Sequence, residues 1–299
     1  MDEIIKLDTI DQYNKLFGFE TLHPLVSIVD FTKVKEMKNV RINFGFYALF
    51  LKDTKCGDMK YGRQYYDYSD GSIVCLAPGQ VSSIDYDNEV VQPTARGVLF
   101  HSDLIRGTSL SKHIKEYTFF SYEVREALHL SERERHIVTD CLDKIQMELE
   151  HAIDNHSKRL ITIQIELLLD YCMRFYERQF ITRSDINKDI IVKFEKLLEE
   201  YFQKQTAQEK GLPSVKYFAD KVFLSSNYFG DLIKKETGKS AQEYIQGKTM
   251  EFAKEQILTT DKTISQIAYE LGFQYPQHFS RQFKRSTGST PNEYRLMNS

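Results

Sequence analysis

The order of hydrophobic and polar residues divides the chain into a β-rich first part and a helical second part. Short apolar runs rich in Val, Ile, Phe and Tyr fill residues 23–105 and are separated by Gly, Asp, Asn and Pro. Residues 41–51, 73–76 and 97–100 are predicted to be strands, and residues 77–79, Ala-Pro-Gly, a turn. This pattern is typical of a small antiparallel β domain.

Helical periodicity begins near Ser131. Apolar residues recur at every fourth position, at Ile137, Cys141, Ile145, Leu149 and Ile153. A second amphipathic run covers residues 160–180, and a third helix is expected at about 189–202. Long amphipathic helices that follow a β domain need an apolar surface, which is either a second copy of the chain or the core of their own domain.

The last third of the chain contains an internal repeat, in which residues 215–245 resemble residues 264–295. Phe218, Ala219 and Val222 match Ile267, Ala268 and Leu271 at a spacing of 49. Phe229, Lys234, Gly238, Glu243 and Tyr244 match Phe279, Lys284, Gly288, Glu293 and Tyr294 at a spacing of 50. Each copy predicts a short helix with a small residue, a tight turn and a second helix, which together make a helix-turn-helix motif.

Matching stop and start signals follow the second helix of each copy. Gly238 and Gly288 stand where a positive φ ends a helix, and residues 240–243 and 290–293 predict capping boxes. Between the copies, residues 241–258 predict one linking helix, about 27 Å long at about 1.5 Å per residue. This length suits two reading helices placed about one DNA turn, roughly 34 Å, apart. The predicted target is double-stranded DNA, contacted in two consecutive major-groove segments.

The apolar positions of each second helix determine which side faces outward. Phe229, Leu232 and Ile233 are expected to face inward, as are Phe279 and Phe283 in the second copy. The outward positions are Ser226, Asn227, Gly230, Asp231 and Lys234 in the first copy and Pro276, Gln277, Ser280, Arg281 and Lys284 in the second.

Six of these residues are candidates for reading bases. Arg forms bidentate hydrogen bonds to guanine and Gln or Asn to adenine, each pair worth about 1–3 kcal/mol of discrimination. We expect base contacts from Gln277 and Arg281 first, and then from Ser280, Asn227, Asp231 and Gly230. For Arg281 the alternative is a phosphate contact or a surface salt bridge. Asp231 either accepts a hydrogen bond from cytosine N4, or it faces water and its helix binds DNA weakly.

Basic residues near these positions are candidates for contacts to phosphates, which give affinity without sequence preference. They are Lys234, Lys235, Lys248, Lys284 and Arg285. Overall charge alone does not establish such binding. The 299-residue chain has a formal net charge of −3, whereas residues 212–299 hold 12 basic and 9 acidic side chains. The C-terminal part is therefore mildly basic and the remainder acidic, which permits polyanion binding.

Length favours two domains, and residues 203–213, polar and ending in Gly and Pro, are predicted to be the linker. We therefore expect a first domain at residues 1–202, with its β part at 23–105 and its helices at 131–202, and a second at residues 214–299. No apolar stretch approaches the roughly 18 residues of a membrane span, and no basic segment followed by an apolar run opens the chain. We expect a cytoplasmic protein without a membrane partner.

The sequence offers little catalytic chemistry. The four cysteines, Cys56, Cys75, Cys141 and Cys172, form no CxxC pair and are expected to be reduced and mostly buried. The eight histidines contain no HxH pair, and no GxxxxGK[ST] or GxGxxG motif occurs at a strand-to-helix turn. A DNA-repair methyl acceptor would need activated cysteines, which the spacing does not indicate. We predict no enzymatic activity, no cofactor and no metal.

The repeat carries a family resemblance. Residues 212–297 resemble the DNA-binding domain of the AraC/XylS family of bacterial transcription regulators, with LGFQYPQHFSRQFKRSTGSTPNEYR at residues 271–295 nearest to the family signature. The segment DGSIVCLAPGQ, residues 70–80, is similar to the strand and turn of a cupin-like sensor domain. The resemblance implies an α+β protein, with an N-terminal antiparallel cupin-like β-barrel and following helices, and an all-α C-terminal domain of two helix-turn-helix motifs.

The resemblance also implies a function. It indicates a DNA-binding transcription regulator, more often an activator in this family, that responds through its N-terminal domain to an unidentified small molecule or partner. A homodimer formed by the N-terminal helices is expected, and RNA polymerase is a further candidate partner. The alternative is a cupin-type enzyme fused to a helical DNA-binding module. In this family a basic residue often follows the small residue of the second helix, as Arg281 follows Ser280. The first copy departs from this pattern, because Asp231 follows Gly230.

Aromatic residues of the β region either line a pocket of the barrel or belong to its core. These residues are Phe44, Phe46, Tyr47, Tyr61, Tyr65, Tyr66 and Tyr68.

Overall fold

The computed structural model describes residues 4–34, 40–52, 71–84, 94–122, 126–152, 154–182 and 184–298. The chain forms two compact units, Met1–Thr182 and Arg183–Ser299. The division falls earlier than the predicted linker at residues 203–213, because the helix before that segment packs with the C-terminal helices.

The first unit contains two β-sheets. The smaller sheet has the order β1-β3-β6, made of β1 (Ile4–Leu7), β3 (Val40–Phe44) and β6 (Val81–Ile84), with β1 parallel to β3. The larger sheet has the order β2-β7-β4-β5-β8, made of β2 (Val26–Asp30), β7 (Ala95–Phe100), β4 (Tyr47–Lys52), β5 (Ser72–Leu76) and β8 (Leu128–His129). In the larger sheet every neighbouring pair is antiparallel. Among the described residues neither sheet closes on itself, so the structure has a β-sheet region where a closed barrel was expected.

The single strand predicted at residues 41–51 is two strands. The chain leaves β3 at Phe44 and enters β4 at Tyr47, and these strands belong to different sheets. Gly45 makes the crossing possible, because a Cβ there would lie 2.7 Å from the Asp8 Cα. Its amide donates a hydrogen bond to the Leu7 carbonyl at 2.7 Å. The hydrophobic run continues through the break because both strands face the same core.

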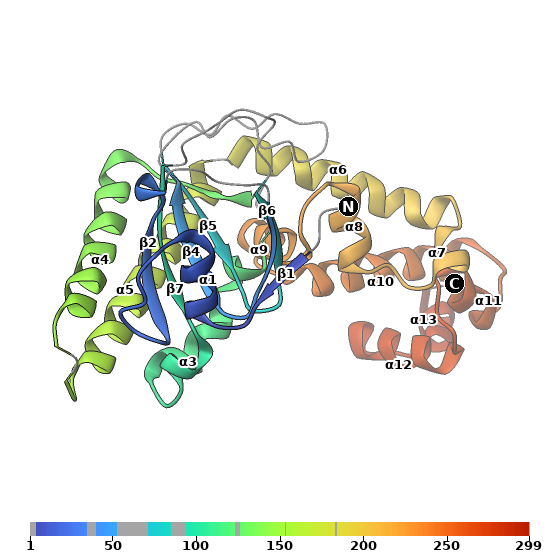
Figure 1. Ribbon diagram of the computed structural model, residues 1–299. Helices are drawn as coiled ribbons and strands as arrows, with labels where there is room; N and C mark the ends of the chain where they lie inside the picture. Colours follow the sequence, from blue (N-terminus) through green and yellow to red (C-terminus); the bar gives the residue numbers. More distant parts are fainter. Residues whose placement is uncertain are drawn as a thin grey trace. The chain divides into compact units, whose positions relative to one another are not determined.

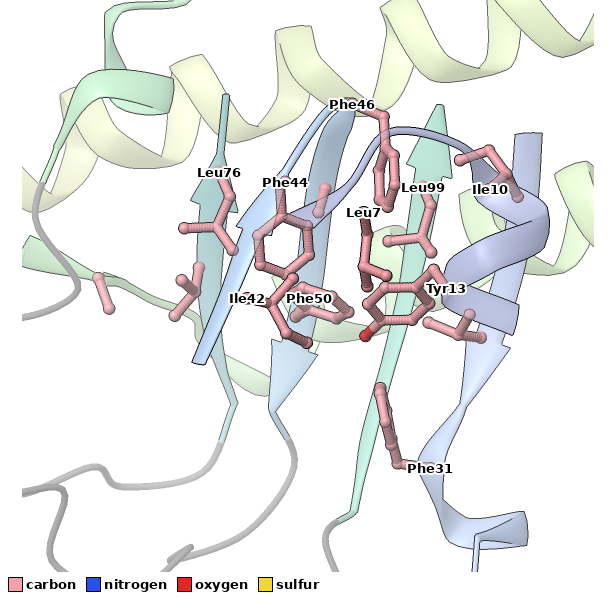
Figure 2. Close-up of a cluster of buried hydrophobic side chains, with 14 residues drawn as sticks. Leu7, Ile10, Tyr13, Phe31, Ile42, Phe44, Phe46, Phe50, Leu76 and Leu99 are labelled. Atoms are coloured by element: carbon pink, nitrogen blue, oxygen red, sulfur yellow. The ribbon is translucent and has the colours of Figure 1, made fainter. Parts of the chain in front are cut away.

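The core of the first unit fills the space between the two sheets (Figure 2). Phe44 of β3 and Phe50 of β4 meet there with ring centroids 6.4 Å apart, and Tyr13 packs on Phe46 at 5.9 Å. Phe44 and Phe46 are therefore core residues, while Tyr47 stacks on Phe100 at 5.0 Å. The other candidate pocket residues, Tyr61, Tyr65, Tyr66 and Tyr68, lie outside the described residues.

Helices and short 3₁₀ turns complete the first unit (Figure 1). The helices are α1 (Ile10–Phe17), α2 (Ser102–Ile105), α3 (Ser109–His113), α4 (Glu132–Glu150) and α5 (Ser157–Thr182). The 3₁₀ turns are η1 (Phe31–Lys33), η2 (Ile114–Glu116) and η3 (Thr118–Ser121). Helices α4 and α5 pack against each other and against β2 and β8, so they cover the core of their own unit. One stripe of α5 stays exposed, at Leu160, Ile163 and Leu167.

The second unit is all-helical. It contains α6 (Ser184–Gln203), α7 (Thr206–Lys210), α8 (Val215–Lys221), α9 (Ser226–Thr237), α10 (Ala241–Thr259), α11 (Ile264–Glu270), α12 (Pro276–Thr287) and α13 (Pro291–Asn298). The predicted linking helix at residues 241–258 is α10. Part of the predicted linker at residues 203–213 is the short helix α7, which packs on α6 and α11.

Candidate nucleic-acid interface

Helices α8 and α9 form one helix-turn-helix, and α11 and α12 form the other. The turns are built alike, because the Leu224 amide donates to the Ala219 carbonyl and the Phe273 amide to the Ala268 carbonyl, both at 2.9 Å. Ala219 and Ala268 are both fully buried, so each small residue lies where the two helices of its copy meet. The sequence repeat is thus a structural repeat.

The inward faces of α9 and α12, here called the reading helices, are those the sequence predicts. Phe229, Leu232 and Ile233 of α9 are completely buried, as are Phe279 and Phe283 of α12. In the first copy the ring of Phe194, from α6, lies 5.0 Å from that of Phe229. The second copy has its own cluster, which α10, α11 and α12 build together. Burial of these side chains fixes the outward face of each reading helix.

The ends of the reading helices confirm the predicted caps. Gly238 and Gly288 end them with φ angles of 72° and 84°. The Glu243 carboxylate accepts hydrogen bonds from the amide and the hydroxyl of Ser240, and that of Glu293 accepts one from the Thr290 amide. The pKa of both glutamates is lowered by these hydrogen bonds. The same local chemistry therefore starts the helix after each copy.

The outward faces carry the candidate base readers. Asn227 on α9 is exposed, and so are Gln277 and Arg281 on α12. Gly230, Asp231 and Ser280 are half-buried. A Cβ added at Gly230 would meet no atom within 4 Å, so packing does not require glycine there. The structure thus places the three candidates of the first copy on one side of α9 and the three candidates of the second copy on one side of α12.

Four of the five candidate phosphate contacts are exposed. Lys234 and Lys235 lie in the last turn of α9, and Lys284 and Arg285 in the last turn of α12. Lys248 differs, because it is half-buried on α10 and forms an ion pair with Glu251 at 2.9 Å. A phosphate would have to compete with this carboxylate for the Lys248 ammonium group.

Arg295 ties the second copy to the linking helix. Its Nε donates to the carbonyl of Ile257 at 2.9 Å, and one Nη donates to that of Lys262 at 2.8 Å. The guanidinium group thus satisfies backbone acceptors at the end of α10 and in the loop before α11, a role available to arginine because its donors form a rigid fork. No role was predicted for Arg295 from the sequence, where its only signal is its place directly after the matched Tyr294.

The part of α6 that supports the first copy was also missed. Phe194 packs on Phe218 with ring centroids 5.2 Å apart, and Tyr201 packs on Phe218 at 5.8 Å. The helix expected at about 189–202 is present as part of α6, but the linker expected at 203–213 placed it in the first domain, whereas it belongs to the second unit. Periodicity shows which face of a helix is apolar and does not show which partner covers it.

Three cysteines show no sign of activation. Cys75, Cys141 and Cys172 are free and buried, and burial raises the pKa of each thiol. Cys56 lies outside the described residues. Among the described side chains, no three His, Cys, Asp or Glu residues are placed to hold a metal ion. Within the same residues, no helix combines the length and the apolar character that crossing a membrane takes.

Comparison with known proteins agrees with this geometry. A family model described as a helix-turn-helix domain matches residues 218–297. The transcriptional regulatory protein YesN of Bacillus subtilis is 40% identical over 94 residues, which are 30% of this chain and 26% of YesN. The probable transcriptional regulator LumQ of Photobacterium leiognathi is 25% identical over 147 residues, 49% of this chain and 54% of LumQ. The chain thus spans between a quarter and about half of these relatives.

A solved structure is similar to about a third of this chain. The C-terminal domain of the response regulator yesN from Fusobacterium nucleatum is 30% identical, with a TM-score of 0.30, and the match covers 34% of this chain and 96% of that domain. The fold and the outward faces together define the second unit as a double helix-turn-helix domain, a class that binds DNA. Residues 218–297 are an AraC-type helix-turn-helix domain.

Proposed function

We propose that the chain is a sequence-specific transcription regulator whose two reading helices enter consecutive major-groove segments of a promoter. The observation that carries this proposal is the pair of buried-inside, polar-outside reading helices, α9 and α12, joined by α10. Nineteen helical residues of α10 extend about 28 Å at about 1.5 Å per residue, close to the roughly 34 Å between successive grooves.

The residues of α12 make two kinds of contact with DNA, to bases and to phosphates. Arg281 and Gln277 read bases, with Ser280 beside them, while Lys284 and Arg285 hold phosphates. On α9, Asn227, Gly230 and Asp231 face the bases, and Lys234 and Lys235 hold phosphates. Lys248 adds a weaker phosphate contact, because Glu251 already neutralises it.

The test begins with the full chain and a pool of random DNA duplexes, from which bound sequences are selected and footprinted. We expect one sequence family with two protected segments about one turn apart, and an affinity that falls steeply with salt. Lys284→Ala should weaken binding to all sequences alike and lower the salt slope by about one. Arg133→Ala, which removes an exposed arginine from α4, is the matched control and should change neither property. A chain that selects no sequence would refute the proposal.

The first unit is proposed to be a cupin-like sensor that transmits a signal to the DNA-binding unit. Two facing sheets over an aromatic core support this assignment at the level of architecture. Binding of a small molecule or partner would shift the population of arrangements that fit the promoter, and activation would follow through contact with RNA polymerase. Transcription from the selected promoter, measured with the whole chain and with residues 183–299, tests whether the first unit regulates.

A homodimer formed through α4 and α5 is part of the proposal. Leu160, Ile163 and Leu167 lie on one stripe of α5 at the 3-4 spacing of a helix–helix seam and are 46%, 44% and 38% exposed. Met147 of α4 is also exposed, at 58%. Sedimentation of the full chain should give a dimer that Ile163→Asp dissociates. Glu177→Gln, on an exposed polar position of the same helix, should leave the dimer intact.

The regulator is proposed to act without enzymatic activity, cofactor or metal, and in the cytoplasm, where promoter DNA is accessible. The buried, protonated thiols of Cys75, Cys141 and Cys172 support this, since a methyl-accepting cysteine must be accessible as a thiolate. A stoichiometric metal ion in the purified chain would instead favour the cupin-type enzyme fused to a DNA-binding module.

A further inference from the structure

The linking helix α10 is not the only connection between the two helix-turn-helix copies. Helix α6 contacts both of them. Near its middle, Phe194 packs on Phe218 and Phe229 of the first copy. At its end, Phe202 packs on Phe252 with ring centroids 4.7 Å apart and joins the hydrophobic cluster of the second copy.

The chain after α6 continues this connection to the turn of the second copy. The Tyr201 hydroxyl donates a hydrogen bond to the carbonyl of Gly211 at 3.0 Å. The backbone of Gly211 lies against Gly272, the glycine of the turn between α11 and α12. Helix α7, just before Gly211, also packs on α11.

Close backbone contacts exclude a side chain at Gly272, which is not so at the other glycines of the repeat. A Cβ at Gly272 would lie 2.5 Å from the Gly211 carbonyl carbon and 2.8 Å from the Leu212 amide nitrogen, and both atoms belong to the backbone. Such atoms move only if the loop and the turn separate. A Cβ at Gly288 would meet nothing within 4 Å, although its φ of +84° is close to the +90° of Gly272.

We propose that α6, α7 and the contact between Gly211 and Gly272 form a brace that fixes the second reading helix relative to the first. Both copies already pack on α10, and a second connection at a different place adds a further constraint on the orientation of one copy relative to the other. Gly272 is therefore a positioning residue. The part of the inference that concerns DNA spacing rests on the proposed function, and the geometric part does not.

The geometric part is tested without DNA. Donor and acceptor fluorophores are attached to unnatural amino acids at positions 235 and 285 of the full chain, in the last turns of α9 and α12. We expect one narrow distribution of energy transfer for the wild-type chain and for Gly288→Ala, and a broadened or shifted distribution for Gly272→Ala. Because the two glycines have nearly the same φ, the control isolates the backbone contact from the cost of a positive φ. Superposition of the Gly272→Ala distribution on that of the wild type would overturn the brace.

A milder variant keeps the test valid if Gly272→Ala does not fold. Tyr201→Phe removes only the hydroxyl that holds the Gly211 carbonyl and keeps the ring, so its circular dichroism should match the wild type. Its energy-transfer distribution should broaden less than that of Gly272→Ala but more than that of Gly288→Ala. No broadening in Tyr201→Phe would contradict the brace.

The consequence for recognition is measured on the selected DNA site and on the same site with one base pair inserted between its two segments. The insertion turns one segment by about 35° relative to the other. We expect the wild type and Gly288→Ala to lose at least about tenfold in affinity on the altered site, and Gly272→Ala to lose about threefold or less. Equal losses in all three proteins would refute the spacing role. If the wild type binds no DNA, the proposed function fails, while the energy-transfer result still decides the brace.

Discussion

The two helix-turn-helix copies share a backbone and differ in what they present outward. Both turns close with the same hydrogen bond, and both reading helices end at a glycine with positive φ. Yet α9 carries two lysines and two acidic residues, whereas α12 carries two arginines and one lysine and no acidic residue. The positions that repeat are thus those that build the fold, and the outward positions that differ are those we propose for recognition of DNA.

Their turns differ as well. The first copy has Phe223 at φ +62°, where the second has Gly272 at φ +90°. A non-glycine residue in this region is strained by its own Cβ. Phe223 nevertheless has room for its side chain, which is 63% exposed, with the Lys193 ammonium 5.3 Å from the ring centre. The second copy cannot accept a side chain there, because the Gly211 backbone occupies the space.

The hydrophobic cores of the two helix-turn-helix copies are supported by different residues, and removing one support should change stability most. Phe194→Ala should lower the free energy of unfolding of the second unit by about 3–5 kcal/mol, because a fully buried ring between Phe218 and Phe229 is replaced by a cavity. Urea unfolding measures the loss, and amide exchange should show α8 and α9 opening before α11 and α12. Val192→Ala, at a position 64% exposed on the same helix, should cost little. Equal loss of protection in both copies would contradict the separate supports.

The next effect concerns selectivity. Arg281→Ala should reduce the preference for the selected sequence over a site with the contacted base pair replaced, by about 1–3 kcal/mol. Asp231→Ala, at a corresponding outward position of α9, should change the preference less, because α9 offers no bidentate arginine. Binding titrations on both sites measure the two differences, with Ser286→Ala as an exposed control on α12. A greater loss from Asp231→Ala would assign the main recognition to the first copy.

A smaller effect tests whether Gly230 is kept for DNA binding, because neither Gly230 nor Gly247 is required by packing. Gly230→Ala and Gly247→Ala both place a methyl group in open space inside a helix, so each should stabilise the chain by roughly 1 kcal/mol. Only Gly230→Ala should weaken DNA binding, since Gly230 lies on the reading face and Gly247 on α10. Melting temperatures and binding affinities of the two variants test this. Unchanged DNA binding by Gly230→Ala would show that no close approach to DNA occurs there.

The smallest predicted effect is a pH-dependent change in stability, and it should be the same in both copies. The pKa of Glu243 and of Glu293 is lowered from 4.5 by hydrogen bonds from the caps, so the folded state favours the carboxylate form. This contribution to stability is complete above the unfolded pKa and is lost as the pH falls through the lower folded pKa. Glu243→Gln and Glu293→Gln should therefore unfold more easily than the wild type near pH 6 and like it near pH 3. Urea unfolding at the two pH values checks this, and a pH-independent difference would contradict it.

Local sequence patterns were enough to predict the repeat, the inward faces of α9 and α12, the caps and the linking helix. Each of these depends on residues within a few positions of one another, so spacing alone defines them. The candidate base and phosphate residues followed from the same spacing, because a buried face at Phe229 or Phe279 determines which side chains point outward.

Which elements pack together could be learned from the three-dimensional fold alone. The run at residues 41–51 gave no sign that Phe44 and Tyr47 enter different sheets, because both strands cover one core. The periodicity of α6 could not reveal that Phe194 supports the C-terminal unit. Nor could the sequence around Gly272 reveal that the backbone of Gly211 lies against it. These contacts join residues far apart in the chain, and a local pattern records that a surface is apolar or a residue small without recording what covers it.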